Sequence, residues 1–127
     1  MAAPYLTDWN PSAKAAMHTE LVAEIGENGK ITVHANDGTK LLEWDLGTVA
    51  GTVNDTTGVL TLTPEEAAVL GLADDDASYA TLRKSDDTPL RSWPCQQGST
   101  AALGYFVMNN LTVATGQTVT MLAHVIR

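Results

Sequence analysis

The sequence is short of several residue types, and each shortage excludes a class of protein. Cys95 is the only cysteine, so no internal disulfide can form, which suits a protein made in a reducing cytoplasm. Lys and Arg total 7 against 15 Asp and Glu, which leaves a net charge of −8. Because that charge repels a phosphate backbone over most of the surface, we expect no nucleic-acid partner. Charged residues make up only 17% of the chain, so much of the surface is left to uncharged polar side chains that can be packed against.

Long hydrophobic runs and export signals are also missing. Residues 1–5 lack the positive and apolar regions of a signal peptide, and no run approaches the roughly 20 apolar residues needed to cross a bilayer. We therefore expect a soluble protein with no membrane contact. The length of 127 residues fits a single domain at residues 10–127, preceded by an arm at residues 1–9.

Patterns that carry catalysis or metal binding are absent from the sequence. There is no Walker loop, Rossmann fingerprint or G-x-S-x-G elbow. The three histidines, His18, His34 and His124, have no cysteine or carboxylate at a metal-ligand spacing. The acids at 74–76 do not match a calcium loop and are expected to form a solvated loop, and Cys95 has no visible base to activate it. We expect no catalytic residue, no metal and no cofactor.

One long helix is predicted at residues 11–25. Asn10 can accept hydrogen bonds from the first free amides, and Pro11 suits the first helical position. Met17, Leu21 and Ile25 then fall four apart and predict one apolar stripe. Glycines at 26 and 29 end the helix.

The arm before this helix carries two large amphipathic rings, Tyr5 and Trp9. Such rings favour interfaces, so we expect the arm to dock on a partner. Two further tryptophans follow. Trp44 is in register with Leu42 and Leu46 and is expected in the core, whereas Trp93 stands at a strand end and is a candidate interface residue.

The rest of the chain has the pattern of short strands. A period of two begins at Lys30, and the Asn-Asp-Gly turn at 36–38 predicts a hairpin. In the last strand Val119, Met121, Ala123 and Val125 are expected on one face. The predicted strands are residues 30–35, 39–46, 59–62, 77–84, 90–93, 105–108, 111–114 and 117–126, with a weaker candidate at 47–53.

Two details qualify this pattern. The residues Thr63-Pro64-Glu65-Glu66 form a capping box that predicts a short helix at residues 64–70. Pro94 removes a ladder donor, so its strand must lie at an edge or end at Trp93. Seven or eight short strands at regular spacing predict a mainly β fold, a jelly-roll-like β-sandwich with an N-terminal α-helix and an extended N-terminal arm.

The last third resembles a known family. Tyr79-Ala80 opens a strand, Gly98-Ser99-Thr100-Ala101 forms a small-residue loop, and Thr115-Gly116 leads into the final strand. In these features the chain resembles the head decoration, or cement, proteins of tailed bacteriophages, although the segment at 94–96 departs from the pattern. The resemblance implies a non-enzymatic protein that binds the major capsid protein on the outside of the capsid as a dimer or trimer. It also implies location on the virion exterior, after assembly in the host cytoplasm.

Other functions remain open at this point. A phage tail or baseplate subunit would share the same strand pattern. A carbohydrate-binding β-sandwich module could use Trp9 and Trp93 to stack on sugars. A hydrolase acting through Cys95 or Ser99 is the weakest hypothesis, because neither residue has an identifiable partner.

Overall fold

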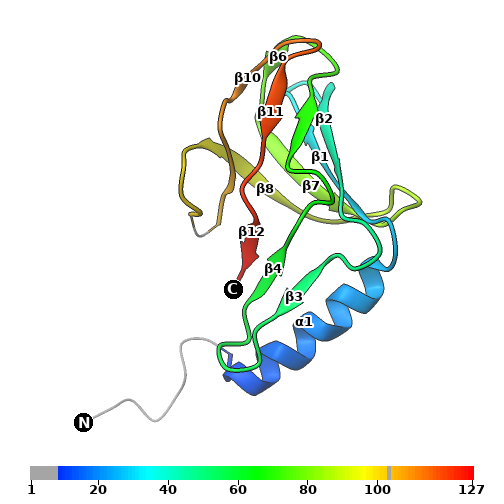
Figure 1. Cartoon of the computed structure of the whole chain (residues 1–127), viewed down its shortest axis with the longest axis vertical. Coiled ribbons are helices and arrows are strands. Elements are labelled where there is room, and N and C mark those ends of the chain that lie inside the picture. The colour runs from blue at the N-terminus through cyan, green and yellow to red at the C-terminus, as the bar shows by residue number, and fades with distance from the viewer. Residues whose placement is uncertain (1–8, 103) are drawn as a thin grey trace.

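The protein is mainly β with a single N-terminal helix, as the sequence predicts (Figure 1). The computed structural model describes residues 9–102 and 104–127. Helix α1 (Pro11–Ile25) has the predicted bounds. The Asn10 side chain accepts a hydrogen bond from the Ser12 amide at 2.9 Å, and the Gly26 amide closes the helix on the Val22 carbonyl at 3.1 Å. Local capping chemistry therefore sets both ends of the helix.

The buried face of α1 differs from the apolar stripe that the sequence predicts. Lys14, His18 and Ile25 are buried, whereas Met17 is 41% exposed. The helix packs along β3 (Gly51–Val53), so its position against the sheet decides which side is covered. A tertiary contact overrides the simple periodicity here.

The centre of the fold is a five-stranded sheet in the order β2-β1-β7-β8-β9. Neighbouring strands are antiparallel except β8 and β9, which pair in parallel. The hairpin at 36–38 is confirmed, with Gly38 at φ 92°. The strands of this sheet are β1 (Lys30–His34), β2 (Lys40–Asp45), β7 (Tyr79–Arg83), β8 (Pro89–Gln97) and β9 (Phe106–Met108).

Three smaller sheets complete the fold and curl around this centre. One has the order β12-β4-β3, and the others are the pairs β10-β6 and β11-β5. Figure 1 shows β3, β4 and α1 at one end of the molecule, with β6, β10 and β11 at the other. The remaining strands are β4 (Leu60–Leu62), β5 (Ala68–Leu70), β6 (Asp75–Asp76), β10 (Thr112–Val113), β11 (Thr118–Thr120) and β12 (His124–Ile126).

The core lies between the five-stranded sheet and these smaller sheets. Trp44 and Phe106 are fully buried with ring centroids 5.6 Å apart, and the Trp44 indole donates to the Ala67 carbonyl at 2.9 Å. The predicted core position of Trp44 is therefore confirmed. Leu60, Leu62 and other aliphatic side chains fill the space around the two rings.

The short helix predicted at residues 64–70 is wrong. The Glu65 amide donates to the Asp45 carbonyl at 2.7 Å, so it is held by β2, and residues 68–70 form β5. The Met121 amide donates to Ala67 and β11 pairs with β5. A helix of about two turns is marginal on its own, and pairing with two other segments outweighs it.

Two other expectations fail at the strand level. Asp75 and Asp76 form strand β6 instead of a free loop, paired with Val113 and Thr112. The strand predicted at 117–126 is two strands, because β11 joins β5 whereas β12 joins β4. Across the break, the side chains that point into the core change from odd-numbered to even-numbered positions. Val119 and Met121 are buried as expected, but beyond the break His124 and Ile126 are buried, Ala123 is exposed and Val125 is half-buried.

Pro94 does not end its strand, and it occupies an edge position. Strand β8 continues to Gln97, and the Cys95 amide donates to the Ser78 carbonyl on the β7 side. Because amides alternate in direction along a strand, the Pro94 nitrogen faces the opposite side, where β9 pairs only from Cys95 onward. The missing donor therefore leaves no gap in the ladder.

Candidate interaction site

Of the three predicted interface residues, the structure exposes Trp9 and covers Trp93. Trp9 is 65% exposed and directly precedes the Asn10 cap of α1. Tyr5 lies outside the described residues. Trp93 is only 5% exposed, because its ring packs on His124 with centroids 4.3 Å apart. The expectation that Trp93 offers a surface contact is therefore corrected: within the described chain it is a core residue.

The start of helix α1, which Trp9 precedes, makes a close contact with the turn between β3 and β4. The His18 ring nitrogen Nδ1 lies 2.6 Å from the Gly58 carbonyl oxygen. Gly58 has φ +76°, and a Cβ on it would approach the Pro11 carbonyl at 2.6 Å and the Lys14 Cβ at 2.7 Å. Only glycine fits between helix and turn, so the start of the helix is fixed on the β-domain.

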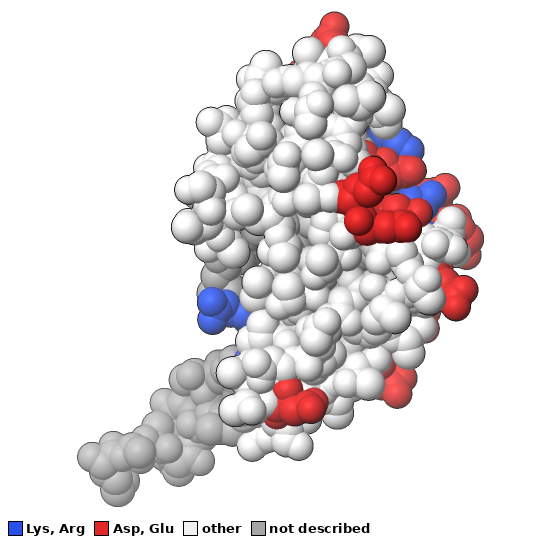
Figure 2. Space-filling model, in the orientation of Figure 1, with Lys and Arg blue, Asp and Glu red and all other residues white. Residues whose placement is uncertain are grey.

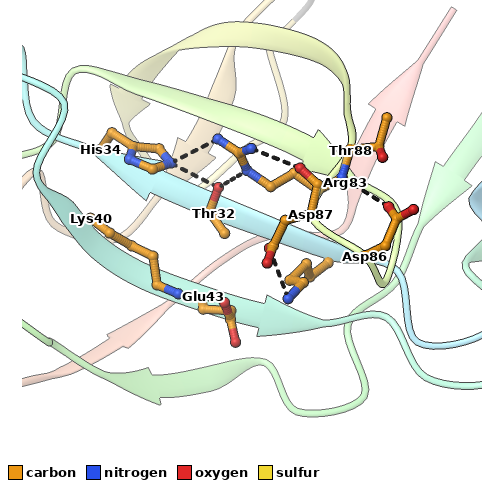
Figure 3. Close-up of polar contacts among 9 residues, drawn as sticks. Thr32, His34, Lys40, Glu43, Arg83, Asp86, Asp87 and Thr88 are labelled. Atoms are coloured by element: carbon orange, nitrogen blue, oxygen red, sulfur yellow. Dashed lines mark hydrogen bonds and ion pairs between the residues drawn. The ribbon is translucent and has the colours of Figure 1, made fainter.

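A polar cluster covers the outer face of the five-stranded sheet (Figure 3). Arg83 donates from Nε to the Thr32 hydroxyl at 2.9 Å and from a terminal nitrogen to the Asp87 carbonyl at 3.1 Å. The Thr32 hydroxyl also lies 2.8 Å from His34, whose ring stacks on Tyr79. Burial lowers the pKa of His34 below its usual value. These contacts hold the Arg83 guanidinium in a hydrogen-bonded network with Thr32, His34 and the Asp87 carbonyl.

Ion pairs border this cluster. Lys30 contacts Asp87 at 2.9 Å and Lys40 contacts Glu43 at 2.7 Å. The hydrogen bond to Asp87 raises the pKa of Lys30, and the same bond lowers the pKa of Asp87. Both pairs are exposed enough for solvent to screen them, so each contributes little to stability. The polar side chains of this cluster therefore make their hydrogen bonds and ion pairs mainly with one another.

An acidic groove of about 270 Å³ lies between β2 and the segment that leads into β5. It is lined by Glu43, Asp45, Glu65, Glu66 and Val69.

Within residues 9–102 and 104–127, no group of three or more His, Cys, Asp or Glu side chains is placed to hold a metal ion. No helix in this part of the chain is long and apolar enough to span a membrane.

Cys95 has the opposite of an activated environment. Its side chain is half-buried on the core side of β8, and burial raises the pKa of its thiol to about 12. A thiol held in its protonated form is a poor nucleophile. This placement gives no support to a cysteine hydrolase.

The feature that sequence reasoning missed is a surface without charge. None of the residues 92–126 is Asp, Glu, Lys or Arg, although the whole chain has 22 of them. These residues form the end of β8, all of β9 to β12 and the loops between them. Figure 2 shows the resulting face, white over β11 and β12, with most of the visible acids on the right-hand flank. Acids border it at β10, because Asp76 accepts a hydrogen bond from the Thr112 hydroxyl and Asp74 accepts one from the Thr115 amide. We call the exposed part of residues 92–126 the uncharged face.

The uncharged face consists mainly of small and polar residues, and among its described residues one large hydrophobic side chain is exposed. Tyr105 is 44% exposed. Around it the exposed residues are mainly Thr, Ala, Gly, Asn and Gln. A count of charged residues along the chain would have revealed this face, because the long gap in charge is visible in the sequence itself.

Comparison with known proteins gives no relative from which a function could be transferred: no family model, curated protein or solved structure matches the chain. The residues and their arrangement therefore carry the functional argument.

Proposed function

We propose that the chain is a structural subunit of a tailed bacteriophage, a head decoration protein that binds the outer capsid surface and stabilises the head. In this proposal it is not an enzyme and it assembles as a dimer or trimer on the major capsid protein. Its location is the virion exterior, reached after assembly in the host cytoplasm. The finer description of the fold as a jelly-roll-like sandwich belongs to the same proposal.

The uncharged face is the observation that carries this proposal. The buried centre of a protein interface is depleted in charged residues, because each charge must lose its hydration. A protein with a net charge of −8 repels its own copies wherever its acids meet. Residues 92–126 give it a broad surface where a second protein can approach at low electrostatic cost. Repeated over a symmetric shell, modest contacts of this kind become strong through multivalency.

Trp9 supports a second contact with the same partner. Its exposed indole lies two residues before a helix whose start packs against the turn at Gly58. A large aromatic side chain on a fixed support is a common anchor of protein interfaces. The sequence places Tyr5 in the same arm, and we propose that residues 1–9 also dock on the capsid.

The test is binding to purified capsids that lack this protein, measured by co-sedimentation. Removing residues 1–9 should abolish binding while the far-UV circular dichroism spectrum stays that of the folded domain. Tyr105→Glu should weaken binding by about tenfold or more, because it buries an unpaired charge at the interface. Asn36→Glu is the matched control, since it adds the same charge to an exposed turn outside the uncharged face.

Two results would overturn the proposal. If neither the truncated protein nor Tyr105→Glu differs from the wild type, these surfaces do not bind the capsid. If the protein binds tails or forms rings or tubes in negative-stain images, it is a tail or baseplate subunit. The carbohydrate-binding hypothesis loses its main support, because Trp44 and Trp93 are buried and leave only Trp9 of the tryptophans exposed.

A further inference from the structure

We propose that His124 is an acid-sensitive latch for the C-terminal strand: its neutral ring holds β12 in the fold, and protonation releases β12 while the five-stranded sheet stays folded. This inference is independent of the proposed function, because it concerns the isolated chain.

His124 joins two sheets that otherwise belong to separate layers. Its backbone pairs with Leu62 in the sheet β12-β4-β3. Its ring packs instead on the five-stranded sheet, 4.3 Å from the Trp93 ring in an edge-on arrangement and 5.5 Å from the Phe106 ring. The side chain is 5% exposed. The packing of the His124 ring therefore attaches β12 to β8 and β9.

Among the described residues, the surroundings of the ring suit a neutral imidazole, and the charge that acts on it is the Arg91 cation. Its Nε2 atom is buried without a hydrogen-bond partner among the described residues. On the same face of β8 lie Arg91, whose guanidinium sits 5.1 Å from the Trp93 ring centroid, and the half-buried thiol of Cys95. Tyr105 lines a small cavity of about 10 Å³ together with His124.

No carboxylate is available to compensate the charge from the strands packed on this ring. Strands β4, β9 and β12 contain no Asp, Glu, Lys or Arg, and β8 contributes only the Arg91 cation. The Trp93 ring, which could otherwise attract a cation, already has that guanidinium over it. A protonated His124 would thus be desolvated beside a like charge.

The sign of the pH effect follows from this environment. Burial, and after it the charge of Arg91, lowers the pKa of His124 from 6.5 to about 4. A histidine whose pKa is lowered in the folded state stabilises that state fully above its unfolded pKa, and this contribution is lost as pH falls toward the folded pKa. At about pH 5 the ratio of open to closed β12 should rise about twentyfold over its value at pH 7.

Local release is favoured over global unfolding by the position of β12. It is a three-residue strand at the end of the chain, and among the described residues β4 is its one hydrogen-bonded neighbour in the sheet. Opening it breaks few contacts, whereas β1 and β7 are each paired on both sides. Segments with few contacts open at lower free energy than central strands.

The experiment is hydrogen exchange of the full chain at neutral pH and near pH 5, corrected for the intrinsic exchange rates. We expect protection of the β12 and β4 amides to fall by about twentyfold while protection of the β1 and β7 amides is retained. In His124→Phe, which fills the aromatic seat without a titrating group, β12 protection should not depend on pH. If that variant fails to fold, His124→Gln gives the same comparison with a neutral polar side chain. His34→Gln is the control, because it removes a buried histidine from the opposite face of the sheet and should leave the response of β12 unchanged.

Three outcomes would overturn the latch. Protection of β12 at pH 5 equal to that at neutral pH would mean that protonation does not open it. Parallel loss of protection in β12, β1 and β7 would mean that acid unfolds the whole domain. An equal pH response in the wild type and in both His124 variants would place the titrating group elsewhere.

Discussion

Gly58 is the position where a single methyl group should separate helix α1 from the β-domain. A Cβ at this position would lie 2.6 Å from the Pro11 carbonyl oxygen and 2.7 Å from the Lys14 Cβ. Both distances are shorter than atomic packing permits, and neither contact is with the flexible end of a side chain. Gly58→Ala therefore requires the first turns of the helix to move away from the turn between β3 and β4.

The expected loss of free energy of unfolding in Gly58→Ala has two parts. A left-handed backbone with φ +76° costs an alanine roughly 1–2 kcal/mol. Overpacking a tight contact adds about 1–3 kcal/mol. Gly116→Ala separates the two parts, because Gly116 has φ +80° and a Cβ added there would meet no atom of the described residues within 4 Å. Gly116→Ala should therefore lose only the free energy that the left-handed backbone costs.

The assay is urea unfolding of both variants, followed by tryptophan fluorescence and by far-UV circular dichroism. We expect Gly58→Ala to lose more free energy of unfolding than Gly116→Ala, with the difference equal to the overpacking cost. An equal loss in the two variants would refute the close contact between the helix and the turn.

Two further predictions concern other parts of the structure. Arg83→Met should lower the free energy of unfolding by about 1–2 kcal/mol, because Thr32 and the Asp87 carbonyl lose a donor; full stability of Arg83→Lys would contradict the role of the guanidinium geometry, since an ammonium cannot reach both acceptors in the same way. The Cys95 thiol should react slowly with a disulfide reagent in the native protein at mildly alkaline pH and rapidly in urea, because its raised pKa of about 12 keeps it protonated when folded. Rapid reaction of the native protein would show that Cys95 is not shielded.

Features that depend on neighbouring residues could be predicted from the sequence. Helix α1 has the expected bounds because Asn10, Pro11 and Gly26 act within one turn of its ends. The hairpin at 36–38 formed because its residues supply the backbone angles that a tight turn needs. The candidate site could be predicted in part. Trp9 is exposed, as its choice as an interface candidate requires, and the lack of charge at 92–126 is visible in the sequence.

Tertiary structure decided the features that depend on distant partners. The capping box at Thr63 does not start a helix, because the segment after it pairs with β2 and β11 and a short helix has little stability of its own. Trp93 is buried because β12 returns over it with His124, a contact between residues 31 positions apart that no local pattern encodes. The sequence by itself determined a mainly β chain with one capped helix among the described residues, and the return of the C-terminal strands determined which side chains are exposed and which are enclosed.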